Sequence, residues 1–327
     1  MVPLDDAEGA ILAHSVALPD RRLRKGMVLT GTDIAMLRGA GIAEVTVARL
    51  DPDDIAEDMA ATRLARALVP GDQGLTLTEA FTGRINLKAT GPGIVAMDVA
   101  AIHRLNRIHP AITLATLPPM TRVAKGTLTG TVKIIAYAVP DAALRKAETI
   151  AHAAIRIRPV TLLTASLLLT EVPGQEAKLT LKGKRAIESR VRALGITLVD
   201  TVVTAHDATA MAVAIAGLQG DFVMILTGSA TSDLFDTAPQ AVRLAGGTVA
   251  RFGMPVDPGN LLFLGALHQR PVIGLPGCAR SPALNGADWV LERIACGVAV
   301  TDDDIAQMGV GGLLKEISIR PQLRDPD

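Results

Sequence analysis

The chain has 327 residues, and hydrophobic residues make up 49% of them, which excludes a disordered chain and favours two domains. Lysine plus arginine equals aspartate plus glutamate, at 33 each, so any anion-binding site must be local rather than a property of the whole surface. Aromatic residues are only 2%, which disfavours a platform for stacking single-stranded nucleic acid.

The cysteines and the apolar stretches predict a cytoplasmic protein. Cys278 and Cys296 belong to no CxxC or Cys/His cluster, which indicates neither a metal centre nor a disulfide framework. The first ten residues carry three acids where a signal peptide would carry positive charge. The longest apolar stretch, residues 160–169, is too short to cross a bilayer, so we expect no membrane segment.

The N-terminal segment reads as small α+β structure. Apolar residues at helical spacing predict a helix over 31–40 that stops at Gly41, and alternation predicts a strand over 42–48. Residues 51–54 (Asp-Pro-Asp-Asp) resemble a capped helix start, so we expect a helix from Asp51 to about Leu68.

Short strands and turns follow, with helices over 98–108 and 140–154. The expected strands are INLKAT (85–90), GIVAM (93–97), ITLATL (112–117) and TVKIIAYAV (131–139). The expected boundary lies at 156–159, which gives an N-terminal α+β region over 1–157, a second domain over 158–300 and a tail over 301–327.

The second half alternates strands and helices with short connections. We expect strands over 159–169, 197–203, 221–226 and 271–273, and helices over 182–194, 206–218 and 239–245. This alternation predicts a three-layer α/β domain with a parallel sheet, in which ligands bind beyond the carboxyl ends of the strands.

Three polar loops fall at those strand ends and are the candidate ligand-binding segments. Small hydroxyl residues, glycines and one arginine suit an anion such as phosphate, because they offer backbone and side-chain donors at close range. Taken singly, each loop could also be an ordinary turn. The candidate residues are Thr227, Gly228, Ser229, Ala230, Thr231, Ser232 and Asp233 in the first loop, Asp257, Pro258, Gly259 and Asn260 in the second, and Pro276, Gly277, Cys278, Arg280 and Ser281 in the third.

From residue 159 to about 298 the sequence resembles the molybdenum-cofactor biosynthesis domain shared by molybdopterin adenylyltransferases and molybdotransferases. The family's Gly-Leu-Pro-Gly-Asn-Pro-Val-Ser motif appears here as GLPGCARS (274–281), and the other two loops match in order and spacing. A bacterial subgroup of molybdopterin-binding proteins, many fused ahead of a cytidylyltransferase-like domain, is most similar. Its phrases include EGAILAHS (8–15), AFTGRINL (80–87) and FGMPVDPGNLL (252–262).

The departures from the family concern acids that handle metal and nucleotide. Where the relatives have a Thr-Gly-Asp-Glu turn after the first strand of the domain, we align residues 164–167 (Thr-Ala-Ser-Leu), which contain no acid. The family's Ser-x-x-Asp-Gly-Tyr segment has no counterpart. Asp207 and Asp236 remain as candidate catalytic residues, although Asp207 could simply cap a helix, and His206 beside it reads as an exposed turn residue.

The resemblance implies a pterin ligand, molybdopterin or molybdenum cofactor, with Mg²⁺ and a nucleotide as further candidates. We expect a homo-oligomer that binds the pterin without turnover and that presents it to a cytidylyltransferase partner, with no nucleic-acid or membrane partner. The alternatives are an active molybdotransferase or adenylyltransferase, and a scaffold protein with a vestigial pterin site.

Overall fold

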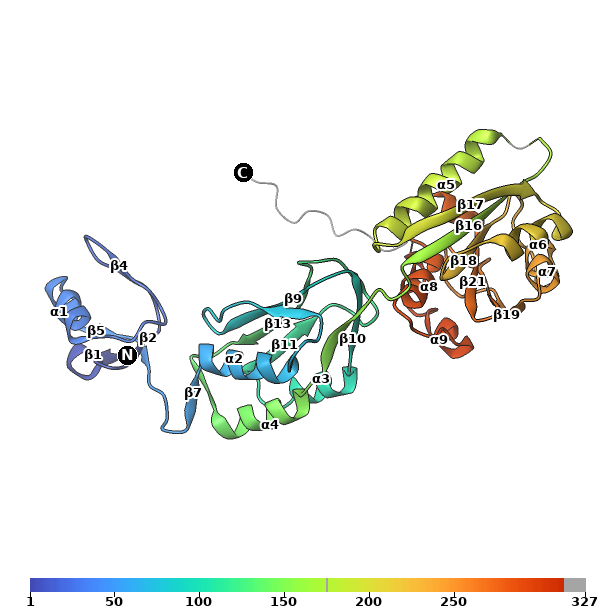
Figure 1. Ribbon diagram of the computed structural model, residues 1–327. Helices are drawn as coiled ribbons and strands as arrows, with labels where there is room; N and C mark the ends of the chain where they lie inside the picture. Colours follow the sequence, from blue (N-terminus) through green and yellow to red (C-terminus); the bar gives the residue numbers. More distant parts are fainter. Residues whose placement is uncertain (175, 315–327) are drawn as a thin grey trace. The chain divides into compact units, whose positions relative to one another are not determined.

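The computed structural model describes residues 1–174 and 176–314, with Ala177 described by its backbone only. The chain divides into two compact units (Figure 1). The first contains residues 1–91 and 95–157, and the second contains residues 92–94 and the chain from Arg158 onward.

Residues 1–49 form short antiparallel strand pairs and one helix around a small apolar core that includes Leu12, Leu23 and Leu37. Helix α1 (Gly31–Gly39) lies where its spacing predicted, and a capping box between Thr30 and Asp33 begins it. The other elements are the 3-10 helix η1 (Leu4–Asp6) and the pairs β1 (Val2–Pro3) with β5 (Glu44–Val45), β2 (Ile11–Leu12) with β6 (Val47–Ala48), and β3 (Val16–Ala17) with β4 (Arg22–Leu23).

The prediction that a helix opens at Asp51 is wrong. Strand β7 (Asp54–Ala56) pairs with β14 (Ala138–Pro140), and helix α2 begins only after it, over Glu57–Leu68. The Asp54 carboxylate accepts a hydrogen bond from the Asp51 amide at 3.1 Å, so the Asp-Pro pattern forms a turn instead of a helix cap.

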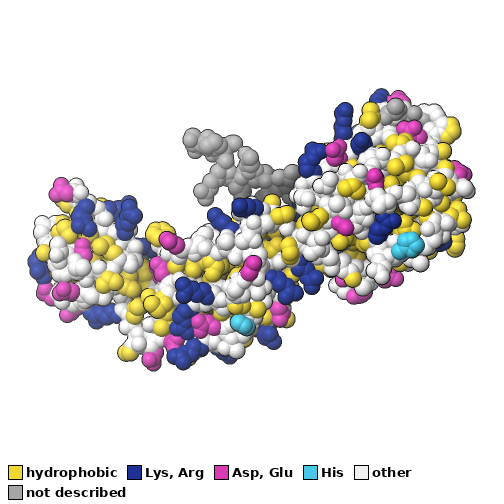
Figure 2. All heavy atoms as spheres, viewed as in Figure 1, with side chains coloured by type: hydrophobic (Ala, Val, Ile, Leu, Met, Phe, Trp, Pro, Cys, Tyr) yellow, Lys and Arg dark blue, Asp and Glu magenta, His cyan; other side chains and the backbone are white. Residues whose placement is uncertain are grey.

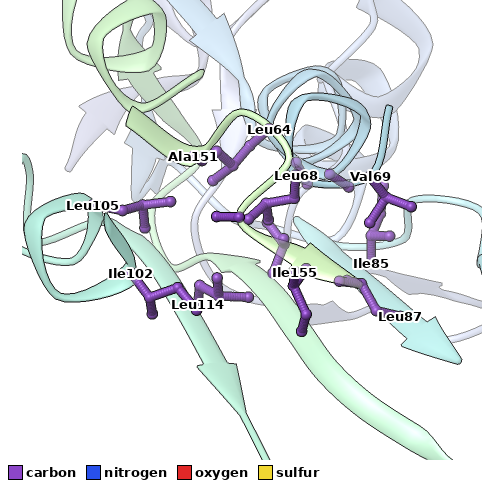
Figure 3. Packing of buried hydrophobic residues seen from close by; sticks show 14 of the residues in the cluster. Leu64, Leu68, Val69, Ile85, Leu87, Ile102, Leu105, Leu114, Ala151 and Ile155 are labelled. Carbon is purple, nitrogen blue, oxygen red and sulfur yellow. The ribbon is translucent and has the colours of Figure 1, made fainter. Parts of the chain in front are cut away.

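The remainder of the first unit packs helices on antiparallel strands, and its core gathers side chains from several elements (Figure 3). Leu64 and Leu68 of α2 lie in this core with Ile85 and Leu87 of β9. One sheet has the order β11 (Ile112–Thr116), β13 (Leu128–Ile134), β9 (Arg84–Ala89) and β8 (Leu75–Leu77), and another has the order β12 (Arg122–Val123), β10 (Gly93–Met97) and β15 (Ile155–Pro159). The other helices are α3 (Val99–Leu105) and α4 (Asp141–Ala151).

The second unit is a six-stranded sheet between two helical layers. The strand order is β17 (Thr197–Ala205), β16 (Thr164–Glu171), β18 (Phe222–Leu226), β21 (Arg270–Leu275), β20 (Phe263–Leu267) and β19 (Thr248–Phe252). Alternate residues of β16 enter opposite cores, since Leu167 and Leu169 pack with helices α5 (Ala177–Arg192) and α8 (Gly286–Ala295), whereas Leu168 packs with α6 (Ala208–Gly217) and α7 (Thr237–Leu244). The short helices η2 (Gly277–Arg280) and α9 (Asp302–Gln307) complete this unit.

The sheet is mixed, which corrects the expectation of a parallel sheet. Strand β20 runs antiparallel to both β19 and β21. Only two residues, His268 and Gln269, separate β20 from β21, and a connection that short cannot make the crossover that parallel strands require. Strands β19 and β20 were not predicted, because the alternation of strands and helices stops where this hairpin begins.

One edge of the sheet carries the candidate loops. Strands β16, β17, β18 and β21 are mutually parallel, and β19 runs in the same direction because two antiparallel pairings separate it from β21. The carboxyl ends of all five strands therefore lie along the same edge. In the described part of the chain, no helix combines the length and the apolar character that crossing a membrane requires.

The close packing of Gly274 under an aromatic ring gives a first prediction. Phe263 pairs with Gly274 across β20 and β21, and a Cβ atom at Gly274 would lie 1.9 Å from the ring carbon Cε1. We expect Gly274→Ala to lower the free energy of unfolding by about 1–3 kcal/mol through overpacking, measured by urea denaturation. The control, Gly217→Ala, adds a Cβ with no atom within 4 Å and should be neutral or slightly stabilising. Wild-type stability in Gly274→Ala would contradict this packing.

Candidate functional site

The three candidate loops all start or end at the carboxyl edge of the second unit's sheet. Residues 227–236 follow β18, residues 253–262 join β19 to β20, and residues 276–285 follow β21. Strands β18 and β21 are hydrogen-bonded neighbours, so the first and third loops begin side by side. The structure thus brings together the loops that the sequence separates.

Arg190, near the end of α5, holds the loop after β21 in place. Its Nε donates to the Asp288 carboxylate at 2.6 Å, and only 11% of either side chain is exposed. The two Nη atoms donate to the carbonyl oxygens of Ala279, Ser281, Ala283 and Ala186 at 2.7, 2.6, 3.0 and 3.4 Å. These bonds engage all five guanidinium N–H donors, so the loop has one fixed course over α5.

A cavity of about 530 Å³ lies between this loop and the first half of α5. That volume falls within the range of small-molecule sites. Among the described residues, the charged ones in the lining are Lys182 and Arg280, and none is a carboxylate. The other lining residues are Leu179, Pro258, Gly277, Cys278, Ser281, Ala283, Leu284 and Leu314. The cavity therefore combines apolar walls with positive charge, whereas acidic and basic side chains are interspersed on the visible face of the molecule (Figure 2).

Arg280 bridges the first and third loops. Its guanidinium donates to the carbonyl oxygens of Thr227 and Gly277. Burial lowers the pKa of Arg280 below its ordinary value, and its buried Nε has no hydrogen-bond partner within the described residues. Gly183 of α5 leaves room for this side chain, since a Cβ there would lie 2.8 Å from Leu226 and 3.4 Å from Arg280. A partly desolvated cation without an ion-pair partner among the described residues is suited to an anionic ligand.

The loop after β18 directs some of its amides inward. The Gly228 amide donates to the Thr170 hydroxyl at 2.8 Å, and the Ser232 amide donates to the Asp236 carboxylate at 2.7 Å. Between them, the amides of residues 229–231 have no acceptor within the described part of the chain. Ser229 and Ala230 are exposed and Thr231 is buried. This run of unpaired donors is the segment of the loop that suits an anion.

The second loop, residues 253–262, contacts the segment after α9 and the start of α8. Asp257 precedes Pro258 through a cis peptide bond, and its backbone pairs with Gly312 and Leu314 at 2.8 and 2.9 Å. Gly259 lies so close to the start of α8 that a Cβ atom would be 2.6 Å from the Gly286 amide nitrogen. Of the four candidate residues here, Pro258 alone lines the cavity, while Asp257, Gly259 and Asn260 do not.

The two candidate catalytic acids begin helices. Asp207 accepts from the amides of Thr209 and Ala210 at 3.1 and 2.9 Å at the start of α6. Asp236 begins α7. Burial alone would raise the pKa of Asp236, but hydrogen bonds from Ser232 and Thr237 outweigh it, so the pKa lies below its ordinary value. Asp233 accepts from the Phe235 amide at 2.6 Å. Each of these carboxylates thus has a local structural role.

The alignment of residues 164–167 with the family's acidic turn is wrong. These residues begin strand β16, and Ala165, Ser166 and Leu167 are fully buried, with 0% exposed. The strand ends at Glu171, whose carboxylate is exposed and accepts from the Thr180 hydroxyl at 2.8 Å. An acid therefore does stand where the first strand of the domain ends. The signal was present in the sequence, because the apolar run continues to Leu169 before Pro173 and Gly174 break it.

Sequence reasoning also missed Thr170, Lys182 and Arg190. Lys182 and Arg190 both belong to the helix expected over 182–194, but nothing in the spacing of Arg190 reveals that its partners are loop carbonyls. No three His, Cys, Asp or Glu side chains group closely enough to hold a metal ion, within the residues that the structure describes.

Comparison with known proteins identifies only part of the chain. A family model described as "Domain of unknown function (DUF8806)" matches residues 1–49. No curated protein matches the sequence. A solved structure, the molybdopterin biosynthesis MoeA protein from Pyrococcus horikosii, is similar over 90% of this chain and 75% of its own, at 15% identity and a TM-score of 0.32. A likeness that weak carries no weight for fold or function.

The Arg190 contacts give a second prediction. We expect Arg190→Ala to lower the free energy of unfolding by about 3–5 kcal/mol, because it leaves a buried carboxylate and several carbonyls without their donor. The measurement is urea denaturation. The matched control is Arg192→Ala on the same helix, whose ion pair with Glu188 is largely exposed and should contribute less than about 1 kcal/mol. Equal losses in the two variants would show that Arg190 does not hold the loop.

Proposed function

We propose that the second unit binds molybdopterin or the molybdenum cofactor at the carboxyl edge of its sheet. The observation that carries the proposal is Arg280, which lines a cavity whose described lining residues include no carboxylate, and which has no ion-pair partner among the described residues. A terminal phosphate would supply the missing negative charge and accept from the guanidinium. The pterin would occupy the apolar part of the cavity, against Leu179 and Leu284.

The sequence motifs support a pterin over other phosphorylated ligands. Four of the residues that line the cavity belong to the GLPGCARS segment, which is the most specific match to molybdopterin-handling proteins: Gly277, Cys278, Arg280 and Ser281. Residues 227–233 do not line the cavity, but the loop that carries the unpaired amides of residues 229–231 begins beside the GLPGCARS segment, and under this proposal those amides bind the anionic part of the ligand. Under this proposal the chain presents its cofactor to a cytidylyltransferase partner.

A second candidate function, transfer of a nucleotide or of molybdate to the pterin, is favoured by Glu171. This carboxylate stands at the end of β16, where the relatives place an acid for metal and nucleotide handling. Carboxylates are the ligands that Mg²⁺ prefers.

Titration of the purified chain with molybdopterin tests the proposal, with and without Mg²⁺ and ATP or CTP. Saturable binding without nucleotide turnover supports the binding function, and nucleotide hydrolysis or transfer supports the second candidate. Absence of binding would overturn both and leave a scaffold role.

The cationic cavity gives a third prediction. We expect Arg280→Ala to weaken molybdopterin binding by about 1.5–3 kcal/mol, as for a lost charged hydrogen bond, with a smaller loss at high salt. Isothermal titration calorimetry provides the measurement. Arg185→Ala, an exposed arginine on the same α5 helix that does not line the cavity, is the control and should bind as the wild type does. If the Arg280 variant keeps wild-type affinity, the phosphate lies elsewhere.

The acids at the strand ends give a fourth prediction. Asp207 and Asp236 are engaged at helix starts and Glu171 with Thr180, so no set of hard ligands is assembled for a Mg²⁺–nucleotide within the described residues. We expect no substantial cofactor formation from molybdopterin, ATP, Mg²⁺ and molybdate by the purified chain. Robust formation that is lost in Glu171→Gln or Asp236→Asn, but kept in the control Glu188→Gln, would make this chain an enzyme.

A further inference from the structure

Thr170 connects two loops of the carboxyl edge. It lies next to the end of β16, which has β17 on one side and β18 on the other, and only 1% of the residue is exposed. Its hydroxyl oxygen accepts from the Gly228 amide at 2.8 Å and lies 3.0 Å from Nδ1 of His206. Gly228 follows β18 and His206 follows β17, so one buried side chain joins the residues after both neighbouring strands.

The chemistry of a hydroxyl makes this contact directional. A threonine hydroxyl has one hydrogen to donate and two lone pairs that accept. One lone pair is taken by the Gly228 amide, and the hydroxyl can then donate to Nδ1 of His206 or accept from it, according to the tautomer of the ring. In either case the imidazole holds the hydroxyl oxygen of Thr170, and that oxygen holds the Gly228 amide.

The direction of the Gly228 amide decides which way the next amides face. Because its N–H points inward to Thr170, the turn begins with one donor satisfied inside the protein. The unpaired amides of residues 229–231 come directly after it. A loop without this anchor could rotate those donors away, at little cost to the rest of the domain.

We propose that Thr170 is a positioning residue for the anion site, and that His206 acts through it by orienting its hydroxyl. The ligand in this proposal rests on the proposed function, whereas the anchoring of the loop does not. The plain alternative is that the Thr170 hydroxyl merely satisfies its own buried oxygen and that its methyl group packs. If Thr170 positions the loop, ligand binding depends on its hydroxyl; in the alternative, binding does not depend on the hydroxyl as such.

Two substitutions at the same position separate the methyl group from the hydroxyl. Thr170→Val keeps the shape and removes the hydroxyl, and Thr170→Ser keeps the hydroxyl and removes the methyl. We expect Thr170→Val to weaken molybdopterin binding about tenfold or more, and Thr170→Ser to stay within about twofold of the wild type. The control is Thr204→Val. Thr204 lies opposite Thr170 in the register of β16 and β17, and its hydroxyl has no hydrogen bond among the described residues. Normal binding by Thr170→Val, or equal losses in the valine and serine variants, would overturn the proposal.

Hydrogen exchange at the Gly228 amide tests the anchor without any ligand. We expect this amide to be protected in the wild type and in Thr170→Ser, and to exchange about tenfold faster or more in Thr170→Val. His206→Ala should accelerate exchange at Gly228 by a smaller factor, and His206→Asn, which returns a polar atom near the Nδ1 position, should restore protection. Unchanged exchange at Gly228 in both Thr170→Val and His206→Ala contradicts the anchoring role. Faster exchange in a protein that does not bind molybdopterin would refute the proposed function alone.

Discussion

The candidate site depends on one buried guanidinium. Arg190 reaches from α5 to the loop after β21 and gives every N–H donor a partner, including three carbonyl oxygens of that loop and the carboxylate of Asp288. Asp288 in turn accepts from the Asn285 amide at the start of α8. A helix on one side, a loop in the middle and a second helix are thus fixed together, and the cavity is the space that this arrangement leaves open.

Arg190 and Arg280 have different roles in this region. Arg190 is fully hydrogen-bonded and neutralised by a carboxylate, so it has nothing to offer a ligand. Arg280 has no ion-pair partner among the described residues, and burial already lowers its pKa. Placing an unneutralised cation beside apolar side chains is unfavourable for folding alone, and this is the physical reason for proposing an anionic ligand with an apolar body.

The strand-end carboxylates have local structural roles. Asp207 and Asp236, the catalytic candidates predicted from the sequence, each cap a helix through backbone amides. Glu171 is the acid whose position was not recognised, and its carboxylate is bound to a hydroxyl of α5.

The sequence by itself determined most of the elements and the position of the candidate loops. Local sequence patterns located α1 and α4 and the three helices that alternate with strands in the second unit, because helix formation depends mainly on residues that are neighbours in the chain. Motif spacing likewise located the loops that the fold brings to one edge. The start of α2, the hairpin of β19 and β20, and the end of β16 were wrong or missed, because strand pairing and strand ends are set by partners distant in the chain. Only the tertiary structure decided that Arg190 binds loop carbonyls and that Thr170 anchors Gly228, since a hydrogen bond between distant residues leaves no periodic trace in the sequence.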